Sequence, residues 1–460
     1  MMRISDLRKA EIENVNVTEQ FLGNIEAVAE KGIPETVLDR AKRALLDYIA
    51  VTIAGAKANE GKLVDYFSKE CPEPGKSTLI GMAKKTNLKE AVFLNGLSAH
   101  ALDLDDGTNT GIIHLGSPIF SVLMPLAEKH HISLEKMLRA AIIGYETSFG
   151  MAVSIQPKHK MMGYHATGTC GVLGIAVAVA YMLDFSRAEL RNAFAIAAVS
   201  ASGMLKVLDD GSELKPYNVA KSALLGLIAT QMAKAGFVGH HDVLGGDRGY
   251  LKMMTGSNQL SLCEPLLNGT YAIEKSYTKP YAACRYCHPA IEASIKLGNS
   301  VNVGEIGDIT VRTYDLAVRG HDHSDIKGIG SAKMSIPYGV AVGLLKGKAG
   351  LLEYDEEHVR DEAILGLTQR VHVQGDAVFS AQFPKMQTAK VTITLKNGTE
   401  VDEQVDFPKG EPENPMSDKE FEDRFMDLLH YAGRSTEEGL RIIEVCNDIT
   451  SCVADVCETI

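Results

Sequence analysis

A helical spacing of apolar residues runs through the first half of the chain and constrains its fold more than any other feature. Between about residues 17 and 265, segments such as PETVLDRAKRALLDYIAVTIAGA and NVAKSALLGLIATQMAKAG repeat apolar side chains every three or four residues. Ser186 and Glu189 have the spacing of a capping box that begins a helix, and Gly236 is placed to end another. This half of the chain is therefore predicted to be all-α.

The pattern changes near Tyr271, where apolar and polar residues begin to alternate. DITVRTYDLAV and KVTITLKNGTEVDEQVDF are typical of strands, and Asn397-Gly398 in the second predicts a two-residue hairpin turn. Between them, MSIPYGVAVGLLKG and DEEHVRDEAILGLTQRV predict two helices lying on an antiparallel sheet. Ser417 and Glu420 then form a further capping box, where the helical pattern returns.

The expected fold class is mainly α, in two domains. A chain of 460 residues with 45% hydrophobic content is long enough for such a division. The large all-helical domain comprises residues 1–268 and 403–460, because the last helices are expected to rejoin the first ones. The smaller α+β domain, residues 269–402, is inserted between these two segments.

Charge and hydropathy exclude several classes of partner. The net charge is −12 and the basic residues form no stripe, so no nucleic acid partner is expected. Residues 161–183 contain no Asp, Glu, Lys or Arg, but their glycines, threonines and His165 favour a buried helix over a membrane span. The N-terminus lacks the apolar region of a signal peptide, and the eight scattered cysteines suit reduced thiols, so a cytoplasmic location is expected.

One polar segment, HALDLDDGTNTGIIHLGSP at residues 100–118, stands out against its apolar surroundings. Its acidic and imidazole side chains are His100, Asp103, Asp105, Asp106 and His114. Such groups held away from water must be paired, solvated, metal-bound or catalytic. The segment therefore indicates a functional site, with an acidic solvated loop and one helix cap as the alternative interpretation.

Four more polar segments interrupt the apolar pattern. They are GYHATGTCG with His165, LDDGSELKPYN with Lys215, KPYAACRYCHPAIEA, and GSAKMSIPYG. Lysines can hold carboxylates, and a histidine or aspartate can move a proton. A helix-rich domain carrying these residues at element ends is suited to acid/base chemistry on a small anion.

Motifs for haem and metal binding offer alternatives to this interpretation. CRYCH at 284–288 matches the pattern of covalent haem attachment, and Cys284, Cys287 and His288 could begin a zinc site. Haem would need axial ligands and an export route, and zinc a further ligand, so two packed thiols beside one functional imidazole are favoured. A divalent metal on the acidic segment is a weaker alternative. Because no complete metal-ligand set is present and no glycine-rich phosphate loop follows a strand, neither a metal nor a cofactor is expected.

The ordered set of segments resembles the MmgE/PrpD family, whose members include 2-methylcitrate dehydratase, cis-aconitate decarboxylase and iminodisuccinate epimerase. The resemblance is carried by AKRALLDYIAVTIAG, HALDLDDG with a following H-x-G-S-P, GYHATGTCGVLGIAVA, SASG followed by GSELK, AGFVGHHDVLGGDRGYL, KPYAACRYCHPAIEA, AKMSIPYGVA and PKGEPENPMSDKEF. It implies a helical domain built from both chain ends, a smaller α+β lid domain, a homodimer, and a cofactor-free active site in the cleft between the domains.

The resemblance also assigns site residues. The catalytic set it implies is Asp103, His114, His165, Lys215 and, from the lid, His288; the substrate-binding set is Lys279, Ser117 and Lys333. Lys215 and Lys279 would bind carboxylates and stabilise negative charge, His114 and His165 would transfer protons, and Asp103 would orient or tune an imidazole. Gly107 stands where the family usually has Thr, and the loop from there to His114 is about one residue longer.

The activity expected from the resemblance is that of a lyase, a dehydratase or decarboxylase, acting on a small di- or tricarboxylate such as a 2-methylcitrate- or cis-aconitate-like acid. An isomerase or epimerase using the same groups is the first alternative, and a non-catalytic binding protein on this fold is the second. Cys284 and Cys287 are expected to be dispensable, because the resemblance directs only the His288 imidazole toward the cleft.

Overall fold

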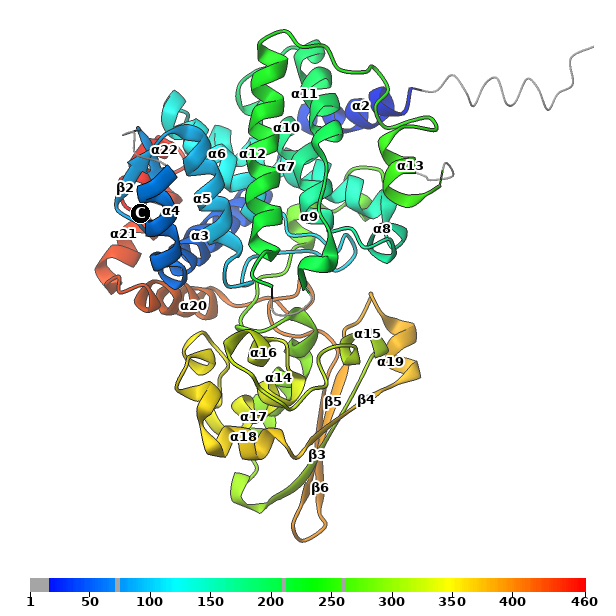
Figure 1. Cartoon of the computed structure of the whole chain (residues 1–460), viewed down its shortest axis with the longest axis vertical. Helices are drawn as coiled ribbons and strands as arrows, with labels where there is room; N and C mark the ends of the chain where they lie inside the picture. The colour runs from blue at the N-terminus through cyan, green and yellow to red at the C-terminus, as the bar shows by residue number, and fades with distance from the viewer. Residues whose placement is uncertain (1–15, 71–74, 209–211, 258–261) are drawn as a thin grey trace, which may run out of the picture.

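The computed structural model describes residues 16–70, 75–208, 212–257 and 262–460. The N-terminal stretch examined for a signal peptide, Cys71, and the Asp-Asp-Gly of LDDGSELKPYN lie outside these residues. Within them the protein is mainly helical and has two parts, one above the other in Figure 1. We call them the helical part, α2–α13 with α20–α22, and the sheet part, α14–α19 with β3–β6.

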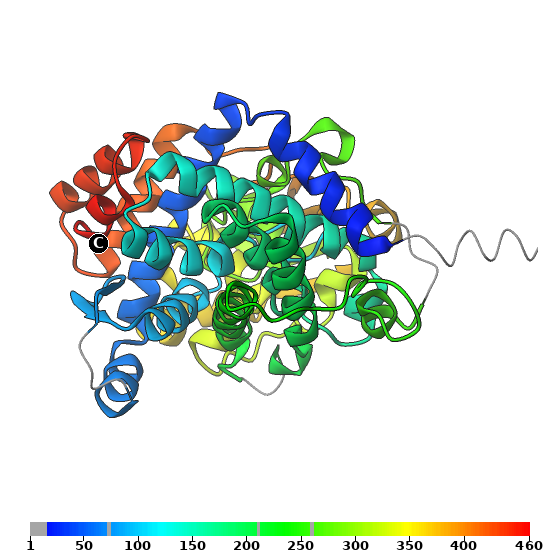
Figure 2. The same cartoon turned by 90° about the horizontal axis from the view of Figure 1, so that it is seen from above.

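The helical part is formed from both ends of the described chain. Its elements are α2 (Val17–Glu30), α3 (Glu35–Ala58), α4 (Glu60–Glu70), β1 (Ser77–Leu79), β2 (Lys84–Thr86), α5 (Leu88–His100), α6 (Gly116–His130), α7 (Leu134–Ile155), α8 (Lys158–Met161), α9 (Ala166–Thr169), α10 (Gly171–Met182), α11 (Arg187–Ser200), α12 (Lys215–Lys234), α13 (Tyr250–Thr255), α20 (Asp418–Tyr431), α21 (Thr436–Asn447) and α22 (Val453–Cys457). Figure 2 shows the red C-terminal helices beside the blue N-terminal ones, and α20 and α21 pack against α3.

The core of this part depends on close helix packing at small residues. Helix α10, from the uncharged stretch singled out in the sequence, is buried except at Tyr181 and packs against α7. A Cβ atom on Gly174 would lie 1.9 Å from the Ser148 hydroxyl oxygen and 2.5 Å from the Gly144 carbonyl oxygen. The two backbones approach this closely only because glycine has no side chain. Among the described residues, no helix combines the length and apolarity needed to cross a membrane.

The local signals for helix ends and for the hairpin are confirmed. Ser186 and Ser417 each begin a helix as one half of a capping box, with Glu189 and Glu420 as the other half. The turn between β5 and β6 contains Gly398 at a φ of +84°, which suits glycine. The seven cysteines that the structure describes are all free thiols.

The sheet part contains a four-stranded sheet with helices against it. Its elements are α14 (His288–Gly298), β3 (Ile306–Thr313), α15 (Asp315–Val318), α16 (Ile329–Lys333), α17 (Ile336–Lys346), α18 (Glu362–Thr368), β4 (Val371–Gly375), α19 (Ala377–Gln382), β5 (Ala389–Leu395) and β6 (Glu400–Val405). The strand order is β4-β3-β5-β6. Helix α14 packs on β5 and β6, and α17 and the short α15 pack on β4, whereas α18, the second helix expected on the sheet, packs mainly on α17.

The expectation of a purely antiparallel sheet is wrong, because β4 pairs parallel to β3 while the other two pairings are antiparallel. Parallel strands need a long crossover. The chain from β3 to β4 supplies one, since it contains α15 to α18. Near the expected domain boundaries, the 3₁₀ turn Ala272–Lys275 packs on α3 and α7, and β6 continues to Val405.

Candidate active site

A cavity of about 200 Å³ lies where the two parts meet, and both parts contribute to its walls. This volume is several times the roughly 30 Å³ occupied by a water molecule in the liquid, so it suits a small molecule. Of the residues assigned from the sequence, Asp103, His114, His165, Lys215 and Lys279 line it. Asp103 and His114 come from the loop between α5 and α6, His165 and Lys215 from the starts of α9 and α12, and Lys279 from the irregular segment before α14.

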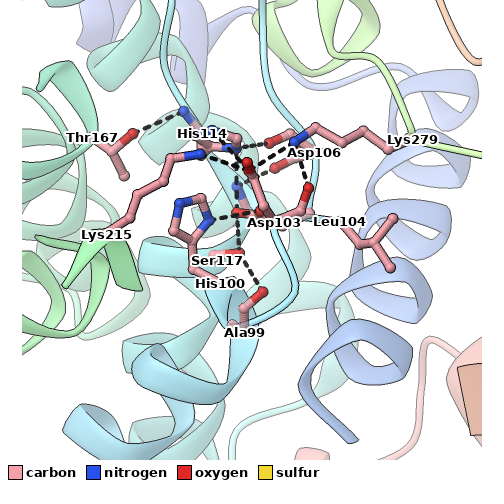
Figure 3. Close-up of polar contacts among 12 residues, drawn as sticks. Ala99, His100, Asp103, Leu104, Asp106, His114, Ser117, Thr167, Lys215 and Lys279 are labelled. Carbon is pink, nitrogen blue, oxygen red and sulfur yellow. Dashed lines mark hydrogen bonds and ion pairs between the residues drawn. The ribbon is translucent and has the colours of Figure 1, made fainter. Parts of the chain in front are cut away.

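Asp103 is at the centre of the polar network (Figure 3). It lies in the loop between α5 and α6 with a φ of +54°, a left-handed conformation that Asp tolerates better than most residues. Its Oδ1 atom is 2.7 Å from the Lys215 Nζ and 2.8 Å from the Lys279 Nζ. Lys279 also donates to the Asp103 carbonyl oxygen at 2.5 Å. One carboxylate therefore sits between two ammonium groups.

Pairing with Lys215 and Lys279 keeps the Asp103 carboxylate ionised. Burial alone would raise the pKa of Asp103, but Lys215 and Lys279 outweigh it and hold the pKa well below its usual range. Burial likewise acts to lower the pKa of Lys215, and Asp103 reverses the effect. The Asp103 side chain is still 27% exposed and that of Lys215 21%, so a ligand in the cavity can reach them. Two positive charges against one negative leave this wall able to bind an anion.

His114 has a defined tautomer. Its Nδ1 atom lies 2.8 Å from the Asp106 carbonyl oxygen, which can only accept, so Nδ1 carries the proton. The Nε2 atom then keeps its lone pair and lies 3.9 Å from Asp103 Oδ1. Burial lowers the pKa of His114 to about 3, which keeps the ring neutral at neutral pH. This geometry makes His114 Nε2 a candidate general base.

Asp105 supports the loop from behind. Its carboxylate accepts from His100 Nδ1 at 2.7 Å and from the Ser117 hydroxyl at 2.6 Å. Burial acts to raise the pKa of Asp105, but His100 and His114 hold it below its usual value. Ser117 was expected to bind substrate, but it is buried and absent from the cavity lining. Its position at the start of α6 directs the hydroxyl to Asp105 instead.

Asp106 is a structural member of the same loop. Its carboxylate accepts from the Gly116 backbone amide at the start of α6 and from the Tyr145 hydroxyl, both at 2.8 Å. Burial raises the pKa of Asp106 to about 7. Because Asp106 does not line the cavity, its role is to anchor the loop to α6 and α7.

His165 approaches from the start of α9 and lines the cavity. Its ring centroid is 6.4 Å from that of His114, and its buried Nδ1 atom has no hydrogen-bond partner in the part of the chain that the structure describes. Burial holds the pKa of His165 well below its usual value. A neutral imidazole with a free nitrogen is thus placed next to the Asp103 and Lys215 pair.

The expectation that His288 faces these residues across the cleft is wrong. His288 is completely buried and does not line the cavity. Its Nε2–H donates to the Ala283 carbonyl oxygen at 3.0 Å, and its Nδ1 accepts from Arg285 at 2.7 Å. The 3₁₀ turn Arg285–Cys287 precedes α14 and directs Cys284 and Arg285, rather than His288, to the cavity.

Lys333, expected to bind substrate, is also absent from the cavity lining. Burial lowers the pKa of Lys333 to about 8, with Asp103 opposing the shift and Lys279 adding to it. Its carbonyl oxygen accepts from the Cys284 amide at 2.8 Å, which fixes the backbone of the CRYCH segment. Lys333 therefore adds positive charge near the site without a direct cavity contact.

Sequence reasoning missed several lining residues. They include Lys160, Tyr286, His321 and Thr108, and Cys284, which was expected only to pack, lines the cavity as well. Lys160 donates to the Tyr286 hydroxyl at 2.8 Å and adds a further cation.

Gly107 pairs with Tyr277 in an isolated bridge, and a Cβ atom there would lie 2.5 Å from the Tyr277 hydroxyl. Thr108 is the hydroxyl residue that borders the cavity at this point.

Arg424 on helix α20 holds both the Lys279 segment and the loop that carries Asp103 in place. The buried Arg424 guanidinium donates to the Lys279 carbonyl oxygen at 2.6 Å, to the Leu104 carbonyl oxygen at 3.1 Å, and to Asp47 at 2.5 Å. These contacts tie the Asp103 loop, the Lys279 segment and α3 to one side chain. The C-terminal helices therefore position the site although they do not line it.

A metal could in principle bind between His100, Asp103, Asp105 and His114, whose ligand atoms lie within 4.8 Å of one another. The Lys215 and Lys279 ammonium groups already contact the Asp103 carboxylate. The positive charges of these two lysines, in direct contact with Asp103, would repel a divalent cation bound to the same carboxylate. The donor set therefore fits an anionic ligand better than a metal.

The fold and the cavity together define a mainly helical protein whose cavity is lined by imidazoles, a carboxylate and ammonium groups. Family models agree with this class: the MmgE/PrpD N-terminal domain matches residues 19–263 and the MmgE/PrpD C-terminal domain residues 281–449. The chain belongs to the MmgE/PrpD family.

Three named relatives cover much of the chain. Cis-aconitate decarboxylase-like protein oryM of Aspergillus oryzae is 26% identical over 449 residues, covering 90% of each chain. The cis-aconitate decarboxylase of Aspergillus terreus is 26% identical over 445 residues, covering 91% of this chain and 89% of its own. A 2-methylcitrate dehydratase of Cupriavidus necator is 25% identical over 309 residues, covering 62% and 61%.

Proposed function

We propose that the protein is a lyase that dehydrates or decarboxylates a small di- or tricarboxylate, such as a 2-methylcitrate- or cis-aconitate-like acid. The observation that carries the proposal is the Asp103 carboxylate held between Lys215 and Lys279 at the wall of a small cavity. The names of the relatives, decarboxylase and dehydratase, support the same class of reaction.

The proposed chemistry moves a proton, or removes a carboxylate, at a carbon next to a carboxylate. Lys215 and Lys279 bind the substrate carboxylate and stabilise the negative charge that develops as an enediolate. The free Nε2 of His114 and the neutral ring of His165 transfer protons. Asp103 keeps the two ammonium groups charged and in place.

The remaining assignments are revised by the geometry. His288 acts through Arg285 as a positioning residue, Ser117 acts through Asp105, and Lys333 contributes positive charge near Asp103 without lining the cavity. The proposal also includes a site that works without metal or cofactor, a homodimer, a cytoplasmic location, and residues 269–402 acting as a lid over the cavity.

An epimerase is the second candidate, because His114 and His165 are two separate imidazoles on the side of the cavity formed by the helical part. Two bases are what inversion at a carbon next to a carboxylate requires. A non-catalytic binding protein on this fold is the third, since fold alone does not fix activity.

The test is incubation with a panel of di- and tricarboxylic acids in deuterated water, followed by NMR and CO2 detection. Loss of water or release of CO2 is the expected result. Deuterium exchange or inversion without net loss would replace the lyase with the epimerase. If no acid in the panel changes although it binds, the protein is a binding protein and the proposal is wrong.

A further inference from the structure

Cys284 and His321 line the cavity on the side formed by the sheet part and the segment leading into it. Neither residue belongs to the network around Asp103, which comes mainly from the helical part. Cys284 lies just before the 3₁₀ turn Arg285–Cys287, and its amide is fixed by the Lys333 carbonyl oxygen at 2.8 Å. His321 lies in the loop between α15 and α16. The thiol and the imidazole therefore border the same cavity, and they are close enough to interact with each other.

The tautomer of His321 follows from its neighbours. Nδ1 lies 3.0 Å from the Arg319 carbonyl oxygen and must donate to it. Nε2 is then the nitrogen with the lone pair, and it is buried without a hydrogen-bond partner among the residues described. His321 is only 6% exposed. The Tyr286 ring packs edge-on against the imidazole, with 5.4 Å between the two ring centroids. A buried nitrogen without a close hydrogen-bond partner calls for an explanation, and the Cys284 thiol is the neighbouring group that interacts with this ring.

The two side chains interact. Burial acts to raise the pKa of Cys284, but the contact with His321 outweighs it and lowers that pKa. Burial acts to lower the pKa of His321, and Cys284 raises it instead. Cys287, three residues further on, is the contrast: it is fully buried, and burial holds its pKa well above the usual value. A thiol is a useful base only as the thiolate, so the partner imidazole decides which cysteine is active.

We propose that Cys284 and His321 form a second proton-transfer pair, on the cavity wall supplied by the sheet part. The thiolate accepts the proton from the carbon next to the substrate carboxylate, so that an S–H bond forms as the C–H bond breaks. The electron pair moves into the enediolate, whose charge Lys215 and Lys279 stabilise. The thiol exchanges its proton with solvent and returns a proton to the carbon in the reverse step. This assignment rests on the proposed function for its substrate class, and it replaces the expectation that Cys284 is dispensable.

The test has a first arm that needs no substrate. Trypsin separates Cys284 and Cys287 into different peptides, because Arg285 lies between them. Iodoacetamide alkylation at a series of pH values, read by mass spectrometry, gives the titration of each thiol. The other titratable groups near the Cys284 thiol are Asp103, Lys160, Lys215, Tyr286, Tyr314 and Cys287.

The expected result is alkylation of Cys284 with a midpoint below the roughly 8.5 of a free thiol, and little alkylation of Cys287. His321→Asn is expected to raise the Cys284 midpoint and slow its alkylation at neutral pH about tenfold or more. A midpoint at or above the free-thiol value that His321→Asn does not move overturns the proposal. So does a Cys284 that never reacts, because iodoacetamide is smaller than the proposed substrate.

The second arm measures deuterium exchange and turnover in Cys284→Ser, with Cys287→Ser as the matched control and circular dichroism to check folding. Loss of a proton-transfer group predicts a fall in kcat of about tenfold or more for Cys284→Ser and under about twofold for the control. Turnover that survives Cys284→Ser overturns the pair and leaves the lyase proposal standing. A low Cys284 midpoint with no acid turned over supports the pair as a reactive site and overturns the lyase proposal.

Discussion

The buried ion pair between Asp47 and Arg424 gives a quantitative prediction about how α20 holds the site. Both residues are nearly inaccessible, at 2% and 8% exposure, and their side chains are 2.5 Å apart. Arg424→Met keeps the volume but leaves Asp47 without its main counterion. Removing one partner of a buried pair costs about 3–5 kcal/mol of unfolding free energy. Urea denaturation followed by circular dichroism measures this loss.

The pH dependence has a defined sign. Burial already raises the pKa of Asp47 despite Arg424, and removing Arg424 raises it further. A carboxyl whose pKa is higher in the folded than in the unfolded state loses stability as pH rises through the folded value. The destabilisation by Arg424→Met is therefore expected to be larger at about pH 8 than at about pH 5.

The double variant Asp47→Asn/Arg424→Met removes the charge as well as the partner. An uncharged buried polar group without a partner costs about 1–3 kcal/mol, so the double variant should recover roughly 2 kcal/mol of the loss in the single variant. The reasoning is refuted if Arg424→Met costs under about 1 kcal/mol, or if the double variant is no more stable than the single one at pH 8.

Three further outcomes are expected. Lys215→Met should lower kcat/KM about 10²–10³-fold because it removes one preorganised charge at the Asp103 wall, while Lys234→Met, on the exposed end of the same helix, should not; equal losses would contradict the assignment. Activity should survive chelators, and elemental analysis should find no stoichiometric metal; activity lost on chelation and restored by one metal would make the acidic segment a ligand set. Burial raises the pKa of Asp106 to about 7, above its unfolded value, so stability from this group is present at low pH and lost as pH rises through about 7. The fall in unfolding free energy between about pH 5 and about pH 9 should flatten in Asp106→Asn, and an unchanged slope would count against it.

The local signals in the sequence predicted the local structure well. Ser186 and Ser417 begin helices because a capping box acts within four residues, and Gly398 marks the hairpin because only its own backbone is involved. Asp103 and Lys215 were found because each interrupts an apolar helix at its end. That Asp103 and Lys215 belong to one site was expected from the family resemblance rather than from the pattern alone.

Side-chain direction at the junction of the two parts was not predictable in the same way. His288 and Cys284 are four positions apart, and which of them faces the cavity depends on a 3₁₀ turn that carries no periodic pattern. His321 is identified only by its contact with Cys284, through a loop with no motif of its own. The parallel pairing of β4 likewise depends on where a long crossover returns, which the alternation of its residues does not specify.

The most direct test of the central claim, that this cavity binds the carboxylate through Lys215 and Lys279, is a crystal structure with tricarballylate, a saturated tricarboxylate without a hydroxyl group to lose. The account predicts one carboxylate within hydrogen-bond distance of both Nζ atoms, with the neighbouring carbon facing His114 or His165 on one side and Cys284 on the other. A tricarboxylate bound elsewhere, with Lys215 and Lys279 still occupied only by Asp103, would contradict it.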